Sequence, residues 1–300
     1  MRGVPPVGFM GMDRRQFIKW CSVLALGSVL GGCRKLPFSG DAAKKGPPSL
    51  KMFEAEVRRA MSMNLRRMDL VPVQMPGRLK RPGASDENRF GMAIDLEACD
   101  GCGKCILACI HENNIPLVTE DDAAKGRFMH WIEMRGGVPF MCAHCGNAPC
   151  ERACPTGAAN HTPDGLSAMM YKRCTGSRYC GANCPEHARK FNFNDAVRQG
   201  LSLKFNDKVP VRDKGVMEKC SLCLHRLQDD RLEVKAAGGV WRGRGVKTAC
   251  AEACPKGAII FGNWLDPDSP LVKAARRRDL YAPEDLAGLD PSVVYMMGGK

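Results

Sequence analysis

The chain has 300 residues and a formal charge of +13, from 45 basic and 32 acidic side chains. Only 6% of the residues are aromatic, whereas 17 are cysteine, 32 glycine and 20 proline, so a large purely organic core is excluded and bound metal is expected to stabilise the fold. The basic residues are scattered and accompany no nucleic-acid-binding motif, which argues against nucleic acid as a partner.

A twin-arginine export signal with a lipobox-like end is predicted over residues 1–33. Arg14 and Arg15 precede an apolar stretch of about 16 residues, which is short for a membrane span and suits a signal. The stretch ends at Cys33, the expected lipidation site; ordinary cleavage or an uncleaved anchor is the alternative. We therefore expect the protein on the periplasmic side of the cytoplasmic membrane, with a lipid on Cys33 as its anchor.

A linker with an amphipathic helix is predicted over residues 34–88. Apolar side chains recur at helical spacing over 51–68, and arginines occupy the opposite face. Such a helix packs on its own domain or docks on a partner. At the other end, residues 263–300 read as an extended polar tail without a second apolar span, so the chain is not expected to cross the membrane after export.

Fifteen cysteines fall into four ordered groups, and the last three groups end in Cys-Pro. Short gaps followed by Cys-Pro are typical of ferredoxins, in which three cysteines of a group hold one iron–sulfur cluster and the fourth reaches another. A disulfide framework or structural zinc does not explain this repeated pattern. The groups are Cys99, Cys102, Cys105 and Cys109; Cys142, Cys145, Cys150 and Cys154; Cys174, Cys180 and Cys184; and Cys220, Cys223, Cys250 and Cys254.

One ligand is missing from the third group, where Ser177 stands in place of the second cysteine. A serine hydroxyl is a poorer iron ligand than a thiolate. The sequence therefore predicts three [4Fe-4S] clusters and one [3Fe-4S] cluster, the latter of relatively high potential. Ligation of a fourth iron by Ser177 is the alternative.

The repetition of the groups predicts a loop-rich α+β fold of two ferredoxin-like modules, each of the type that binds two [4Fe-4S] clusters. Residues 89–135 and 205–262 are expected to form one module, and residues 136–204 the other. Strands are expected at 91–95 and 258–261, with a short helix after each Cys-Pro.

Three motifs resemble the four-cluster iron–sulfur subunits of the dimethyl sulfoxide reductase family: Cys102–Asn114, Cys142–Cys150 and Lys219–Arg226. A narrower likeness is to the iron–sulfur component of the periplasmic quinone reductase complex Qrc and of alternative complex III. The segments that carry it are Met129–Ile132, Arg173–Cys180, Arg189–Phe193 and Asp266–Ser269.

The resemblance implies that the cysteines bind clusters in four crossed sets. Set one is Cys99, Cys102, Cys105 and Cys254. Set two is Cys109, Cys220, Cys223 and Cys250. Set three is Cys142, Cys145, Cys150 and Cys184. Set four is Cys154, Cys174 and Cys180, with Ser177 at the position of the missing ligand, and is expected to hold the [3Fe-4S] cluster.

The resemblance also implies an electron-transfer subunit rather than an enzyme in its own right, and no catalytic constellation is found in the sequence. It would relay electrons between a cytochrome c and a quinone site. The implied partners are an NrfD-type integral membrane quinone-binding subunit, a molybdopterin-enzyme-like subunit and a multihaem cytochrome c. The alternatives are a small subunit of a periplasmic molybdoenzyme that reduces tetrathionate or polysulfide, and a zinc-stabilised interaction module.

Overall fold

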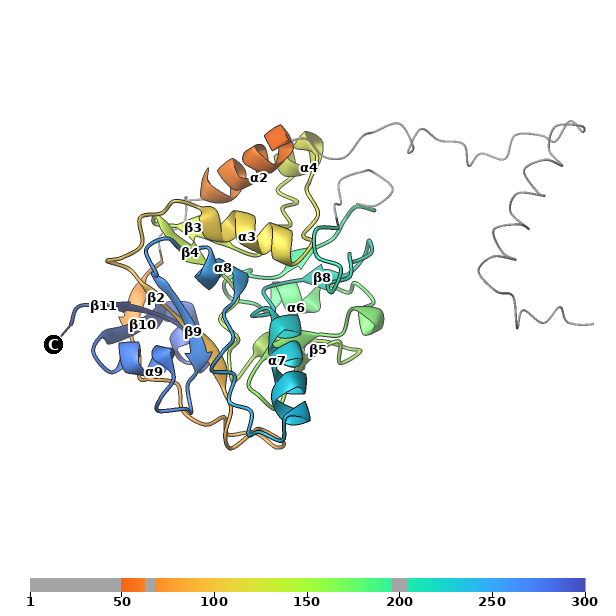
Figure 1. Ribbon diagram of the computed structural model, residues 1–300. Coiled ribbons are helices and arrows are strands. Elements are labelled where there is room, and N and C mark those ends of the chain that lie inside the picture. Colours follow the sequence, from red (N-terminus) through yellow and green to blue (C-terminus); the bar gives the residue numbers. More distant parts are fainter. Residues whose placement is uncertain (1–49, 63–67, 196–203, 300) are drawn as a thin grey trace, which may run out of the picture. The chain divides into compact units, whose positions relative to one another are not determined.

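A computed structural model describes residues 50–62, 68–195 and 204–299 of the chain (Figure 1). The predicted export signal, Cys33 and the first part of the linker lie outside the described residues. None of the described helices is long and apolar enough to span a membrane.

The largest sheet of the described chain has five strands. Its order is β1 (Leu70–Pro72), β10 (Asp279–Pro283), β11 (Val293–Met297), β2 (Phe90–Asp95) and β9 (Ile259–Asn263). Only the β11–β2 pair is parallel. Every residue of β2 is buried, as expected for a strand with neighbours on both sides and apolar side chains on both faces. The strands predicted at 91–95 and 258–261 are thus confirmed as β2 and β9, and β9 begins one residue and ends two residues later than predicted.

Gly91 allows the sheet to close against the C-terminal segment. A Cβ atom at this position would lie 2.1 Å from the Ser292 carbonyl oxygen and 2.1 Å from Trp264 Nε1. Trp264 Nε1 donates a hydrogen bond of 2.9 Å to that same carbonyl. Only glycine permits this close approach of backbone and indole.

The prediction of an extended tail over 263–300 is wrong. The segment forms α9 (Pro270–Ala275), β10, α10 (Glu284–Ala287) and β11, and β11 lies between β10 and β2 in the sheet. Val294, Met296 and Leu271 are buried in a shared apolar cluster. Charged residues around these short elements make the average composition of the segment polar. For this reason the strands were not predicted from the sequence.

Three two-stranded ladders lie beside the cysteine-bearing loops. They are β3 (Glu133–Arg135) with β4 (Val138–Phe140), β5 (Ala159–His161) with β6 (Ser167–Met169), and β7 (Lys190–Phe191) with β8 (Met217–Glu218). The helices among them are α3 (Lys104–Glu112), α4 (Glu120–Ala124), α5 (Pro149–Arg152), α6 (Tyr179–Ala182), α7 (Leu224–Ala236) and α8 (Ala249–Glu252), with a 3-10 turn η3 (Tyr171–Arg173).

The short helices precede each Cys-Pro rather than follow it, so that prediction is also wrong. Helices α5, α6 and α8 each carry the last cysteine before the Cys-Pro of a group, and each ends before that Cys-Pro. A turn then leads into β5, β7 or β9. Proline has no N–H to extend the helix, which explains why the chain turns at this point.

Helix α2 (Leu50–Ser62) packs on its own chain, against α3 and β3 (Figure 1). Glu56, which is 1% exposed, accepts hydrogen bonds from His130 Nδ1 (3.1 Å) and Arg59 (3.0 Å). Met61 contacts the Gly103 region between two cysteines of set one. The helix was predicted to extend to residue 68, but Met68 lies outside it and residues 63–67 are not described.

Replacing Val294 by Asp tests the placement of β11. Val294 is 0% exposed, so an unpaired carboxylate there should cost about 4 kcal/mol or more of folding free energy. Met297 on the same strand is 37% exposed, and Met297→Asp serves as the matched control. We expect Val294→Asp to lose soluble yield and melting temperature and Met297→Asp to keep both. Equal behaviour of the two variants would contradict the buried strand.

Candidate functional site: four sets of cysteine thiols

All fifteen cysteines of the four groups are free thiols, and the structure gathers them across the groups. Electrostatic contacts join Cys105 to Cys99, Cys102 and Cys254; Cys109 to Cys220, Cys223 and Cys250; Cys145 to Cys142, Cys150 and Cys184; and Cys180 to Cys154 and Cys174. These are the members of sets one to four. Their binding of iron stays a prediction.

Electrostatic interactions between the sets place them in a row. Cys105 of set one interacts with Cys250 of set two. Cys220 of set two interacts with Cys142 of set three. Cys150 of set three interacts with Cys180 of set four. The thiols are therefore ordered one, two, three, four through the molecule.

Helix α3 connects the first two sets. Cys105 and Cys109 are four residues apart on this helix, hence on the same face, yet they belong to different sets. Helix α8, which carries Cys250, packs against α3. Gly103 starts α3 in the left-handed conformation (φ 71°), which turns the loop of set one into the helix.

Burial dominates the acidity of the thiols. It raises the pKa of Cys105 and Cys250 to about 12, and that of Cys184 and Cys223 to about 11. Cys154 differs: its slight burial raises the pKa, but hydrogen bonds from Ala159 and Thr156 outweigh this and the pKa is lowered. Buried thiols of raised pKa stay protonated at neutral pH, and bound iron is what deprotonates such groups.

Hydrogen-bond donors point at the sulfur atoms in every set. Backbone N–H groups donate from Ala258 to Cys254 (3.3 Å), from Leu222 to Cys220 (3.5 Å) and from Ala159 to Cys154 (3.4 Å). In set three, Arg189 donates to Cys150 Sγ over 3.1 Å. Such donors stabilise anionic sulfur around a cluster and adjust its reduction potential. Fifteen grouped thiols with donors in place fit iron–sulfur clusters.

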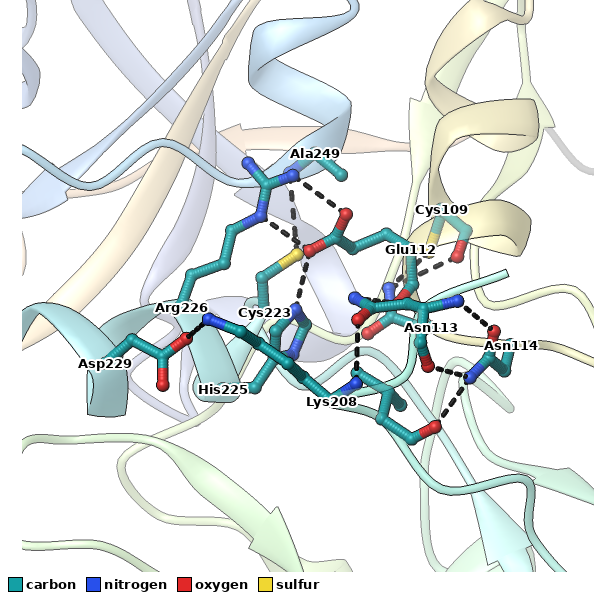
Figure 2. Close-up of polar contacts among 12 residues, drawn as sticks. Cys109, Glu112, Asn113, Asn114, Lys208, Cys223, His225, Arg226, Asp229 and Ala249 are labelled. Carbon is teal, nitrogen blue, oxygen red and sulfur yellow. Dashed lines mark hydrogen bonds and ion pairs between the residues drawn. The ribbon is translucent and has the colours of Figure 1, made fainter. Parts of the chain in front are cut away.

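Hydrogen bonds and ion pairs connect α3 to α7 beside set two, as Figure 2 shows. The Glu112 carboxylate accepts hydrogen bonds from His225 Nε2 (2.6 Å) and from Arg226 Nε (2.6 Å) and NH2 (2.8 Å). The Arg226 hydrogen bonds lower the pKa of Glu112 despite partial burial, and His225 adds to the effect. Asn113 Nδ2 lies 3.5 Å from Cys109 Sγ. These ion pairs join the helix that carries Cys109 to the helix that begins directly after Cys223.

Asn114 anchors the loop that follows the undescribed residues 196–203. Its amide Nδ2 donates to the carbonyls of Asn206 (2.7 Å) and Val209 (2.6 Å), and its Oδ1 accepts from the backbone N–H groups of Phe205 and Asn206 (Figure 2). Glu112, Asn113 and Asn114 were recognised in the sequence only as part of a family motif. Their position three to five residues after Cys109 is the signal that could have indicated these roles.

Set four lies close to the surface. Cys154 and Cys174 are partly exposed, and Ser177 lies exposed in the loop between Cys174 and Cys180. Gly176 precedes it at φ 70°, and a Cβ there would lie 2.3 Å from the Gly215 carbonyl oxygen. The loop that lacks the fourth thiol is thus seated tightly on the neighbouring turn.

The histidines do not form a metal site. His144 lies between Cys142 and Cys145 and is fully buried. A zinc ion needs ligands that converge on one point. Among residues 50–62, 68–195 and 204–299, no three His, Cys, Asp or Glu side chains are placed to hold one metal ion.

Known proteins resemble this chain over its cysteine-bearing part. A family model described as a 4Fe-4S dicluster domain matches residues 98–158. The iron–sulfur cluster-binding subunit of menaquinone reductase from Nitratidesulfovibrio vulgaris is 35% identical over 69% of this chain and 88% of that protein. Iron–sulfur subunit 1 of the Hdr-like menaquinol oxidoreductase from Archaeoglobus fulgidus is 33% identical over 72% of this chain and 86% of the relative.

The similarity extends to reductases that act on sulfur compounds. A subunit of polysulfide reductase from Wolinella succinogenes is 29% identical over 68% of this chain and 92% of its own length. Because such relatives cover two thirds of the chain, the chain belongs to the family of iron–sulfur subunits found in menaquinone, polysulfide and dimethyl sulfoxide-type reductase complexes.

Proposed function

We propose that this chain is the electron-transfer subunit of a membrane-bound, quinone-linked oxidoreductase, and that it relays electrons between a cytochrome c and a quinone site in a partner. The observation that carries the proposal is the row of four thiol sets, each close enough to the next for their thiols to interact electrostatically. One-electron transfer is the chemistry that iron–sulfur clusters supply. Chemistry on a substrate belongs to partner subunits.

The proposed cofactors are three [4Fe-4S] clusters in sets one to three and one [3Fe-4S] cluster in set four. Two ferredoxin-like modules, 89–135 with 205–262 and 136–204, would carry them. The free, grouped thiols and the sulfur-directed hydrogen bonds support this assignment. Ser177 lies in the loop of set four as an exposed hydroxyl, so set four offers three thiols.

Both ends of the row reach the surface and are suited to partner docking. In set one, Cys102 is exposed. Near set four, Tyr179 is 60% exposed and Met170 is 46% exposed, and Arg173 and Arg178 are exposed beside them. We assign the set-four end to an NrfD-type quinone-binding membrane subunit. The set-one end would then face a molybdopterin-enzyme-like subunit and a multihaem cytochrome c, as in a Qrc-like complex.

A second candidate is the electron-transfer subunit of a periplasmic molybdoenzyme. Its support is the similarity to the polysulfide reductase subunit and to a subunit of tetrathionate reductase from Salmonella typhimurium, the latter at 28% identity over 76% of this chain. Ser177 in place of a fourth thiol favours the quinone-linked function. Copurification of a multihaem cytochrome would support the first candidate, and a catalytic molybdoenzyme without cytochrome the second.

Replacing Ser177 by Cys tests the cluster content. The purified wild-type complex should contain about 15 non-haem irons per chain and the near-isotropic EPR signal of an oxidised three-iron cluster. Ser177→Cys should add a ligand, raise the iron content by about one and remove that signal. Thr175→Cys, two residues away in the same loop, is the control and should leave the signal. A wild-type protein without iron would contradict the proposed function as a whole.

Paired cysteine variants test the crossed sets. Cys109→Ser should alter the same EPR signal as Cys250→Ser, because both thiols belong to set two. Cys102→Ser should alter the same signal as Cys254→Ser, because both belong to set one. If Cys102→Ser and Cys109→Ser change one common signal instead, the groups in the sequence bind their clusters without crossing.

Export is tested at the N-terminus. We propose that the protein leaves the cytoplasm by the twin-arginine route and is anchored through lipid on Cys33. Changing both Arg14 and Arg15 to Lys should leave most of the iron-loaded protein in the cytoplasm, as measured by cell fractionation. Cys33→Ala should abolish labelling by a radioactive fatty acid without preventing export. Normal export of the double-lysine variant would argue against the route.

A further inference from the structure

Arg189 is a buried cation that contacts sulfur instead of a carboxylate. It lies just before β7, and the residue is 5% exposed. Its guanidinium donates to Cys150 Sγ (3.1 Å), Met169 Sδ (2.9 Å) and Ser167 Oγ (3.5 Å). Its Nε has no hydrogen-bond partner among the described residues.

The other buried arginines of the described chain are neutralised by acidic side chains. Arg89 pairs with Asp290 at 3.0 Å, Arg212 with Glu218 at 2.8 Å, and Arg135 with Glu133 and Glu186. No carboxylate of residues 50–62, 68–195 or 204–299 forms an ion pair with Arg189. Because an uncompensated buried charge is costly, its counter-charge must come from another group.

The groups that face Arg189 are thiols of two different sets. Cys150 and Cys142 belong to set three, and Cys180 belongs to set four; all three interact electrostatically with the guanidinium. Burial raises the pKa of Cys150 and of Cys180, and Arg189 opposes this rise in both. Arg189 therefore lies where the two sets adjoin.

We propose that Arg189 is the shared counter-cation of sets three and four, and that it holds the reduction potentials of both clusters above the values they would otherwise have. The inference rests on the proposed function, since it requires clusters in these sets. A reduced cluster carries one more negative charge than an oxidised one, so a fixed cation nearby in a medium of low dielectric favours reduction. The hydrogen bond to Cys150 Sγ acts in the same direction.

Lys219 provides a comparison within the same protein. It is 2% exposed, its Nζ donates to the carbonyl of Cys220 (2.9 Å) and also to that of Ser167, and no described carboxylate forms an ion pair with it. It interacts electrostatically with Cys220 of set two and Cys150 of set three. Both Arg189 and Lys219 therefore lie beside set three. In addition, Arg189 lies beside set four, whereas Lys219 lies beside set two.

The test is an EPR-monitored redox titration of the purified complex with Arg189→Gln and Arg189→Lys. The oxidised three-iron signal reports set four, and the reduced four-iron signals report the other sets. We expect Arg189→Gln to shift the midpoint potential of the three-iron signal and of one four-iron signal to lower values. Arg189→Lys keeps the positive charge, so its midpoint potentials should lie close to those of the wild type. If Arg189 had a purely structural role, lysine would not restore the wild-type potentials.

Two controls make the result specific. Lys219→Gln should lower four-iron midpoints and leave the three-iron midpoint unchanged. Arg231→Gln removes a half-exposed arginine that pairs with Asp164 on the surface, and it should shift none of the signals. Unchanged midpoints in Arg189→Gln, or an equal shift of all four signals, would overturn the inference while the iron content still supports the proposed function.

A second pair of variants applies if Arg189→Gln does not retain its iron. Met169 lies 2.9 Å from the guanidinium through its sulfur, so Met169→Glu would neutralise the cation without removing it. Met169→Gln is the isosteric neutral control. The three-iron midpoint should be lower in Met169→Glu than in Met169→Gln, and equal midpoints would overturn the inference.

Discussion

The crossing of distant chain segments at each set of thiols is the constraint on which the rest of the structure depends. Cys254 joins Cys99, Cys102 and Cys105, and Cys109 joins cysteines from Cys220 onwards. Each set therefore closes a loop of tens to more than a hundred residues. Such closure costs conformational entropy, and burial of the thiols adds a cost for any that ionise. Bound clusters offset both costs, so folding and cluster assembly are expected to be coupled.

Much of this arrangement was predictable because cluster ligation leaves a rigid spacing in the sequence. The sequence alone predicted the strands β2 and β9, and the family resemblance implied the crossed sets. The missing iron ligand at Ser177 stays a prediction. The gathering of thiols in the structure follows those sets. Local spacing carries this information because a loop that wraps a cluster places its cysteines a few residues apart, as in Cys99, Cys102 and Cys105.

The parts that escaped prediction depend on long-range packing. Strand β11 pairs with β2 across some two hundred residues, and its short apolar run is hidden by the polar average of residues 263–300. The one-turn helices α5, α6 and α8 are too short to show a helical period. The roles of Arg189 and Glu112 depend on the side chains that surround them in the folded protein, and a single sequence does not reveal these neighbours.

The charges of the protein follow a rule that the fold makes visible. Three of the buried arginines in the described chain pair with carboxylates, as Arg89 does with Asp290. The buried cations without such partners in the described chain, Arg189 and Lys219, both interact electrostatically with thiols of two sets. Adding a carboxylate beside either of them would cancel the field that favours an extra electron nearby. No described acidic side chain pairs with these two cations. This arrangement is expected of a protein whose buried anions are metal clusters. Part of the protein's excess positive charge therefore lies beside the thiol sets.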